Sequence, residues 1–370
     1  MTSAPAAPTS TPEPGEYDVV VIGGGQAALA AGYFLRRTAR SFVLLDDQPT
    51  AGGAWQHTWP SLHLFSPARH SSLPGWLMPD TAGYPSRDAA LAYLRAYEAR
   101  YAIPARRPVR VHETHADTST AAGAPAFTRQ GRLRLHTSVG DVYADAVISA
   151  TGSWRTPIWP ELPSREQFGA HCIHSATYEG AEAYRGRRVL VIGAGNSGAQ
   201  IVADLLDVAQ VTWCVRDEPT FLPDHVDGQY LFEQGTARYK AIQEGRTPDP
   251  PRSLGDIVMV PPVRAARDAG RLTWSPLPQQ LTPHGVVWPD GAEEAIDAII
   301  CATGFRPSLA HLAPALTPNA KGRLDMNGLH AATQAHIYPL GYGDWTGFAS
   351  ATLIGVGRAA KAVVEAIEAG

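Results

Sequence analysis

The segment VVVIGGGQAA, residues 19–28, is the most informative part of this chain. A β-branched run leads into closely spaced glycines and then into a helix-like stretch, which is typical of the strand-turn-helix unit that binds a dinucleotide. The pattern recurs 170 residues later as VLVIGAGNSG, residues 189–198. A duplicated motif is far more specific than a single one, because each copy must satisfy the same backbone geometry. The sequence therefore predicts two dinucleotide-binding units in an α/β protein.

The first unit extends on both sides of its glycines. Residues 17–22 are expected to form a buried strand, 26–37 a helix and 41–45 a second strand. That second strand ends at Asp46, which lies 23 positions after Gly23. A carboxylate about 20 residues after the first glycine is placed to bind a ribose hydroxyl. Asp46 is the expected ribose ligand, with Asp47 as the alternative.

The second unit repeats this order with a different charge at its end. We expect a strand at 189–192, a helix at 196–206 and a strand at 210–215, followed by Arg216 and Asp217. The arginine can bind a 2′-phosphate by a charge-assisted hydrogen bond, while Asp217 can accept from a 2′-hydroxyl. We therefore predict that NADPH is preferred and NADH tolerated.

The composition indicates an ordinary globular enzyme. The 370 residues are 44% hydrophobic and 18% charged, with a formal net charge of −4. This charge disfavours nucleic-acid binding. Residues 1–16 resemble a disordered tail and not a signal peptide, and residues 19–35 contain too much glycine for a membrane span. A cytoplasmic location with no membrane partner is expected.

Cysteine and histidine usage excludes two classes of site. The three cysteines form no Cys-x-x-Cys pair, which argues against a redox dithiol, and we interpret them as small core residues. The histidines are scattered and match no zinc pattern, so no metal is predicted.

Other segments suggest how the chain is divided. Residues 109–150 read as a small antiparallel layer with a hairpin at Gly140, a helix capped by Ser86 precedes them, and a last helix is expected at 350–367. Ala-Thr-Gly triplets at 150–152 and 302–304 end the two nucleotide units. Residues 221–262 fit no regular pattern and are expected to be a lid-like insertion, with an oligomer contact, as in a homodimer, as the alternative.

These motifs, with GGAW at 52–55 and GYGDW at 341–345, resemble the bacterial class B flavin-containing monooxygenases, in particular their short subgroup that includes arsenic-resistance-associated flavoprotein monooxygenases. The stretch FGAHCIHSATY, residues 168–178, resembles the linker fingerprint of that family. Ala170 and Glu179 depart from it, and Phe65 stands where many members carry an asparagine that supports the flavin peroxide. The resemblance implies two Rossmann-like domains in a glutathione-reductase-like flavoprotein: an FAD-binding domain at 17–160 and 305–370, and an NAD(P)H-binding domain at 161–304.

The resemblance also implies a mechanism and site residues. NADPH would reduce FAD, O₂ would add at flavin C4a, and one oxygen would pass to a small-molecule sulfide or amine, or to a ketone. Phe65 and His63 are expected to flank the flavin. The expected FAD contacts are Gly23, Gly25, Gln26, Ala27, Asp46, Gly53, Trp55, His63, Val111, Ala150, Thr151, Gly152 and Asp344. The expected NADPH contacts are Gly193, Gly195, Asn196, Ser197, Gly198, Arg216, Asp217, Ala302, Thr303 and Gly304.

Two alternatives stay open. An uncoupled NADPH oxidase or flavin reductase fits every motif, because Phe65 cannot donate a hydrogen bond to the peroxide. A non-catalytic nucleotide-binding sensor would keep the glycines but lack turnover.

Overall fold

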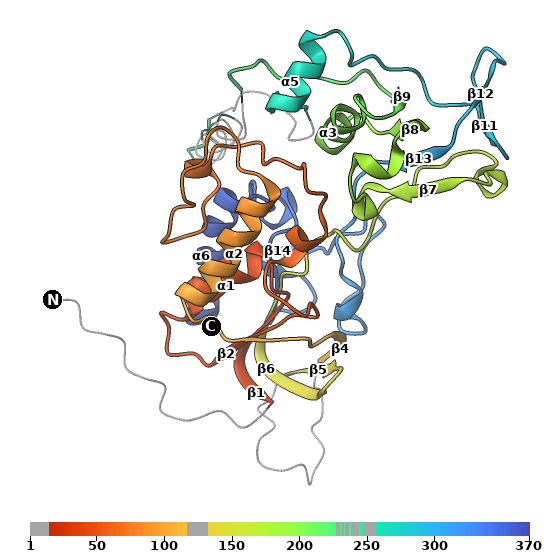
Figure 1. The fold of residues 1–370 in the computed structure, drawn as a ribbon. Helices are drawn as coiled ribbons and strands as arrows, with labels where there is room; N and C mark the ends of the chain where they lie inside the picture. Colours follow the sequence, from red (N-terminus) through yellow and green to blue (C-terminus); the bar gives the residue numbers. More distant parts are fainter. Residues whose placement is uncertain are drawn as a thin grey trace.

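Two sheets, each in its own lobe, organise the molecule (Figure 1). The computed structural model describes residues 15–116, 132–226, 230, 233, 237, 244–246 and 256–370. This two-lobed α/β architecture confirms the fold class expected from the duplicated glycine motifs.

The first lobe is built on a seven-stranded sheet with the order β3-β2-β1-β6-β5-β4 and with β16 added beside β6. Its strands are β1 (Glu16–Ile22), β2 (Phe42–Leu45), β3 (Ala105–Arg106), β4 (Val111–Ala116), β5 (Leu133–Thr137), β6 (Gly140–Ser149) and β16 (Ile337–Pro339). The strand β1 begins at Glu16, so the tail expected over residues 1–16 is wrong at its end, and residues 1–14 lie outside the described residues.

Strand β6 joins the two kinds of pairing in this sheet. Its first half is antiparallel to β5, while its second half runs parallel to β1 and β16, with Ser149 beside Ile22. The antiparallel layer expected over 109–150 is therefore not a separate layer but the continuation of the nucleotide-binding sheet. This continuity brings the end of β6 next to the glycine turn that follows β1.

Three helices cover one face of this sheet: α1 (Gln26–Leu35), α2 (Arg87–Arg100) and α6 (Leu353–Ala369). Small residues let α1 and α6 pack closely in a core that includes Ala31 and Ala360. The Ser86 side chain accepts from Ala89 N at 3.2 Å and begins α2, as expected. Thr352 caps α6 in the same way through Gly355 N, at 3.0 Å.

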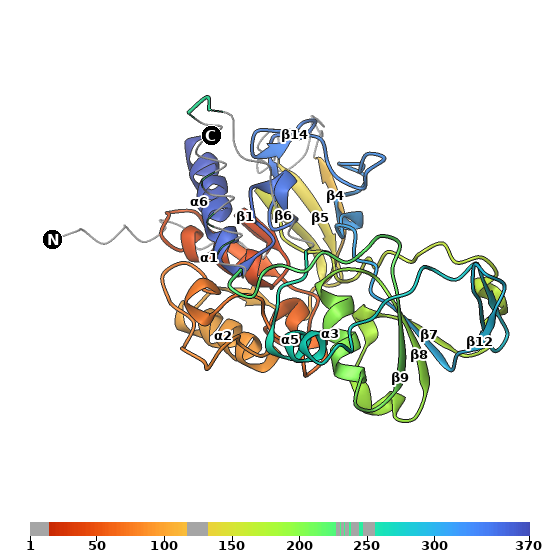
Figure 2. The same cartoon turned by 90° about the horizontal axis from the view of Figure 1, so that it is seen from above.

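The second lobe contains a four-stranded parallel sheet with the order β7-β13-β8-β9. Its strands are β7 (His171–His174), β13 (Ala298–Cys301), β8 (Arg188–Ile192) and β9 (Gln210–Cys214). Helices α3 (Asn196–Leu205) and α5 (Pro261–Asp268) pack on one face. The antiparallel strands β10 (Gln280–Thr282), β11 (Gly285–Val287) and β12 (Glu293–Ala295) contribute to the core on the other face. Figure 2 shows this lobe beside the first.

Short elements complete the described chain: the strands β14 (Met326–Asn327) and β15 (His330–Ala331), and the 3-10 turns η1 (Gly53–His57), η2 (Ala68–His70), η3 (Arg165–Gln167), η4 (Ser175–Thr177), η5 (Ala181–Tyr184), η6 (Ala310–Leu312) and η7 (Asp344–Thr346).

The chain crosses between the lobes twice, and the two crossings lie side by side. Pro157 and Phe305 form an antiparallel bridge. Ile158 N donates to Gly304 O at 2.9 Å, and Arg306 N donates to Thr156 O at 2.8 Å. The joint between the lobes is therefore a short two-stranded ribbon and not a single flexible linker.

Both ends of the expected insertion at 221–262 belong to the core of the second lobe. Leu222 and Val226 are buried, and so is the segment Ile257–Val260. Leu222 N donates to Ile257 O at 2.9 Å, which ties the two ends together. Most residues between them lie outside the described part of the chain, so the lid stays a prediction.

Candidate functional site

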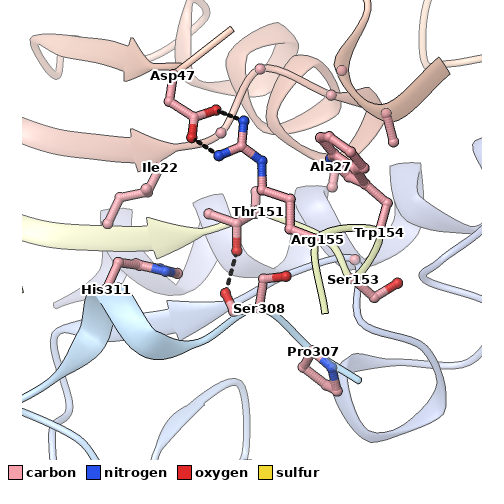
Figure 3. Close-up of a pocket in the computed structure, with 18 of the residues that line it drawn as sticks. Ile22, Ala27, Asp47, Thr151, Ser153, Trp154, Arg155, Pro307, Ser308 and His311 are labelled. Carbon is pink, nitrogen blue, oxygen red and sulfur yellow. Dashed lines mark hydrogen bonds and ion pairs between the residues drawn. The ribbon is translucent and has the colours of Figure 1, made fainter. Parts of the chain in front are cut away.

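A cavity of about 760 Å³ lies where the chain leaves the carboxyl ends of β1, β2 and β6 (Figure 3). This is the edge of a parallel sheet at which nucleotides bind. Its volume falls within the range of about 300–1,000 Å³ that is usual for small-molecule and cofactor sites.

Glycines bring backbone segments into direct contact at this cavity. Gly23 has φ +115°, and a Cβ there would lie 2.6 Å from Ala150 O. Gly53 has φ +55°, and its Cβ would lie 2.6 Å from Gly25 Cα. Larger side chains would therefore push the β1, β2 and β6 ends apart. Gly25 precedes α1 without a side-chain cap, so the first-turn N–H groups are available to an anionic ligand.

Asp46 lines the cavity but is held by an arginine that the sequence analysis missed. Arg107 Nε donates to Asp46 Oδ2 at 2.6 Å, and its two terminal nitrogens donate to the Glu98 carboxylate at 2.6 and 2.7 Å. Burial raises the pKa of Asp46, while Arg107 acts in the opposite direction. A side chain at Gly24 would overlap both Asp46 and Arg107, so this glycine is required by the ion-pair cluster.

A second ion pair, between Asp47 and Arg155, forms part of the cavity wall. Both terminal nitrogens of Arg155 donate to the carboxylate of Asp47, and Arg110 Nε lies 3.5 Å from the same carboxylate (Figure 3). The Arg155 guanidinium also lies 5.1 Å from the centre of the Trp154 ring, which stacks on His57 at 4.1 Å. Both candidate ribose ligands are thus engaged by cations, Asp46 by Arg107 and Asp47 by Arg155, and Asp47 stays the alternative.

Gln26 connects three segments at the N-terminus of α1. Its Oε1 accepts from Trp55 Nε1 at 3.2 Å, and its Nε2 donates to Ala351 O at 2.6 Å. Trp55 and Ala351 both line the cavity. Gln26 therefore fixes the wall near the start of α6 through its side chain.

His311 lines the inner end of the cavity at the head of a polar chain. Its Nε2 lies 3.0 Å from Ser149 Oγ, which in turn lies 2.6 Å from the Tyr342 hydroxyl. That hydroxyl lies 2.8 Å from Thr151 Oγ1, and Thr151 donates to Ser308 O at 2.6 Å. Burial lowers the pKa of His311 to about 4, so its imidazole is neutral near pH 7.

The structure gathers most of the residues expected to contact FAD. Those that line the cavity are Gly23, Gly25, Gln26, Ala27, Asp46, Gly53, Trp55, Val111, Ala150, Thr151 and Gly152. His63 and Asp344 are not among the lining residues, and Asp344 is exposed on η7. Gly341 lines the wall instead, and its positive φ of +87° suits only glycine there.

The second glycine motif has the same construction in the other lobe. Gly193 has φ +137°, and a side chain there would overlap Ala302 O. A side chain at Gly198 would overlap Gly193 O, and Trp213 Nε1 donates to that same carbonyl at 2.8 Å. Gly193 and the N-cap residue Gly195 therefore lie in the tight turn before α3, and Gly198, in the first turn of the helix, packs against it.

The remaining expected NADPH contacts fall into two groups: some lie where a ligand could reach them, and others are hydrogen-bonded to the chain itself. Arg216 and Asp217 are exposed directly after β9, and Ser197 lies in the first turn of α3. Ala302, Thr303 and Gly304 follow β13 as expected, but Thr303 Oγ1 donates to Ile158 O at 2.5 Å and is thus part of the ribbon between the lobes. Asn196 is also engaged by its own chain: its Nδ2 donates to Asp256 O and its Oδ1 accepts from Val258 N, both at 2.9 Å.

His63 and Phe65 lie on a segment of the first lobe that contacts the second lobe. His63 N donates to Gln200 Oε1 at 3.1 Å, which joins this segment to α3. Phe65 packs against the core of the second lobe.

The described part of the chain contains no helix long and apolar enough to cross a membrane. Within those same residues, no three His, Cys, Asp or Glu side chains gather as metal ligands.

The chain as a whole is similar to known flavoproteins. Residues 20–229 match the family model described as pyridine nucleotide-disulphide oxidoreductase. The chain belongs to this family. A solved structure of a flavin-containing monooxygenase from Stenotrophomonas maltophilia is 46% identical, with a TM-score of 0.83 over 96% of this chain and 98% of that one. These findings place the chain among the flavin-dependent monooxygenases of the family.

Two curated relatives show how widely the family extends. The uncharacterized oxidoreductase CzcO of Bacillus velezensis is 29% identical over 217 residues, 58% of this chain and 59% of the relative. The chain thus spans about three fifths of that relative's length. The indole-3-pyruvate monooxygenase YUCCA4 of Oryza sativa subsp. japonica is 28% identical over 332 residues, 79% of this chain and 75% of the relative.

Proposed function

We propose that the protein is an FAD- and NAD(P)H-dependent monooxygenase that transfers one oxygen atom from O₂ to a soft nucleophile, such as a sulfide or an amine, or to a ketone. The observation that carries this proposal is the cavity at the first glycine motif, together with a second motif of the same construction in the other lobe. The 46% identity to a flavin-containing monooxygenase supports the same reaction class. We further propose a cytoplasmic enzyme that forms a homodimer.

The residues on the cavity wall fit FAD. The uncapped first turn of α1 offers N–H groups to a diphosphate, and Asp46 offers a carboxylate to a ribose hydroxyl. Gly53 and Trp55 would border the flavin end, with Gly341 close to α1. We propose the FAD-binding domain at 17–160 and 305–370, and the NAD(P)H-binding domain at 161–304.

Bound FAD would supply the electron transfer to O₂, and the chain would supply orientation and exclusion of water. The first turn of α3 and the exposed Arg216 would hold NADPH, with Arg216 on the 2′-phosphate. Phe65 offers no hydrogen bond, so its part would be limited to shielding the reacting groups from solvent.

The test follows the oxygen of O₂ into the sulfoxide or into hydrogen peroxide. The purified protein, with its released flavin identified, is reduced anaerobically by NADPH and then mixed with ¹⁸O₂ and methyl phenyl sulfide. The expected result is ¹⁸O-labelled sulfoxide in proportion to the NADPH consumed. Hydrogen peroxide in place of sulfoxide, across a panel of sulfides, amines and ketones, would instead establish an oxidase, which the apolar Phe65 favours as the second candidate. A colourless protein that binds no FAD would reject both.

Two variants assign the nucleotide sites separately. Gly25→Val should remove the flavin, because Gly25 lines the cavity directly before α1 and a branched side chain there would occupy the space proposed for the diphosphate. Arg216→Ala should retain the flavin and lose about 10-fold or more of the preference for NADPH over NADH, the value of a lost charged hydrogen bond. An unchanged preference would exclude Arg216 from the site.

A further inference from the structure

Helix α3 carries two amide side chains, Asn196 and Gln200, that are one turn apart and hold the main chain of other segments. Asn196 binds the main chain at Asp256 and Val258. Gln200 binds both main-chain groups of one residue: its Oε1 accepts from His63 N at 3.1 Å and its Nε2 donates to His63 O at 3.3 Å. Only 7% of Gln200 is exposed.

The segment that Gln200 holds is anchored to the first lobe by α2. Arg87 Nε and Nη2 both donate to Thr58 O at 3.1 Å, and Arg87 N donates to Leu62 O at 2.8 Å. Leu64 N donates to Pro85 O at 2.9 Å. The segment is therefore fixed on one side by α2 and on the other by Gln200.

We propose that Gln200 is a positioning residue that sets the distance between the nicotinamide nucleotide and the flavin. This inference rests on the proposed function, in which the turn before α3 binds NADPH and Phe65, two residues after His63, shields the reacting groups. Gln200 lies on the same helix as that turn, five residues after Gly195, so its hydrogen bonds to His63 tie this helix to the segment that α2 anchors on the first lobe.

The two hydrogen bonds between Gln200 and His63 are suited to fixing the position of one segment relative to the other. One hydrogen bond would fix a distance but allow rotation, whereas a donor and an acceptor on the same residue also fix direction. The amide is buried, so losing either partner leaves an unsatisfied polar group. Hydride transfer requires close approach of the reacting atoms, and a shift of about 1 Å can slow a reaction about 100-fold.

Three variants test the contact. Gln200→Met has a similar length and removes both hydrogen bonds. Gln200→Glu can still accept from His63 N but, as a carboxylate, cannot donate to His63 O. Gln210→Met makes the same chemical change at an exposed glutamine at the start of β9 and is the control.

Two measurements are made on the flavin-loaded proteins. Anaerobic rapid mixing with NADPH gives the rate of flavin reduction and the dissociation constant of NADPH. Hydrogen exchange of the His63 amide reports the hydrogen bond to Gln200 without any turnover.

We expect flavin reduction to slow about 10-fold or more in Gln200→Met and less in Gln200→Glu, with the dissociation constant unchanged within about 2-fold. Exchange at His63 should accelerate in the methionine variant alone. If Gln200→Met loses its flavin, the glutamate variant carries the test on its own.

Two results would overturn the inference. Flavin reduction in Gln200→Met could be as fast as in Gln210→Met, or a weaker NADPH affinity could account for the whole loss of rate. Failure of the proposed function is distinguishable, because the unmodified protein would then either not oxidise NADPH or yield hydrogen peroxide in place of oxygenated product.

Discussion

At the scale of single residues, the site depends on side chains that hold other side chains. Arg107 is 11% exposed and joins Asp46 and Glu98, which are 4% and 15% exposed. The buried carboxylate of Asp46 and the half-buried carboxylate of Glu98 share this guanidinium, which at Asp46 opposes the cost of burying the charge. The expected ribose ligand therefore depends on an arginine that is remote from it in sequence.

Replacing Arg107 by methionine should lower the free energy of unfolding by about 3–5 kcal/mol, because it leaves the buried carboxylate of Asp46 without its cation. The loss should shrink as the pH falls, since protonated carboxyl groups need no counter-ion. Urea unfolding at several pH values measures this loss of unfolding free energy. Arg323→Met, at an exposed position, is the control. FAD affinity should fall in parallel, and a variant with full stability would show that Arg107 is not needed to hold Asp46.

His311 predicts a pH dependence of stability. Burial lowers its pKa to about 4, whereas an unfolded histidine titrates at about 6.5. Between these values the unfolded chain binds a proton that the folded one does not, so stability falls as the solution becomes more acidic. The free-energy loss from this group should approach about 3 kcal/mol by about pH 4.

His311→Gln removes that titration while keeping a group that can hydrogen-bond to Ser149. The unfolding free energies of the two proteins should therefore converge, or cross, between about pH 6.5 and pH 4. Parallel curves over this interval in urea titrations would show that His311 does not take part.

At the scale of elements, local patterns predicted more than distant contacts did. Both strand-turn-helix units lie within a residue or two of their expected bounds, because strand burial, glycine conformation and helix periodicity are all encoded within about 30 residues. The domain boundaries and the cofactor contacts remain predictions.

What the sequence did not show are the pairings between distant segments. Strand β7 was interpreted as linker, yet it pairs with β13, more than 100 residues away. Arg107 lies 61 positions from Asp46, and Arg155 lies 108 positions from Asp47. Neither arginine belongs to a motif. Periodicity carries no signal for such contacts, and only the glycine motif indicated where the cavity lies.

Gly53 tests whether contact between turns builds the cavity. Gly53→Ala places a Cβ against Gly25 Cα, whereas Gly83→Ala, also at positive φ (+72°), meets nothing within 4 Å. Both variants share the backbone strain of about 1–3 kcal/mol, so their difference isolates the contact. We expect only Gly53→Ala to lose FAD affinity, measured by titrating apoprotein. Equal losses of FAD affinity in the two variants would mean that backbone strain alone lowers the affinity.

At the scale of the whole molecule, the cavity and the joint between the lobes share residues. The segment Gly152–Thr156 and the segment Arg306–Ser308 both line the cavity, and both belong to the ribbon that connects the lobes. Ser308 N donates to Gly152 O at 2.9 Å, and Ser308 Oγ lies 2.8 Å from Thr156 Oγ1. A ligand in this cavity would therefore contact the joint directly.

Removing FAD should loosen that joint. Ligand binding to the folded state stabilises the elements that it contacts, so the ribbon should open more often in the apoprotein. Hydrogen exchange of the Arg306 and Ser308 amides should accelerate when FAD is removed, and the β13 amides, which lie inside the second sheet, should change little. Ser308→Ala removes the side-chain contact with Thr156 and should accelerate exchange at Arg306 even with FAD bound. Exchange that is the same with and without FAD would show that the joint is held by its own hydrogen bonds, and that the two lobes keep their arrangement independently of the cofactor.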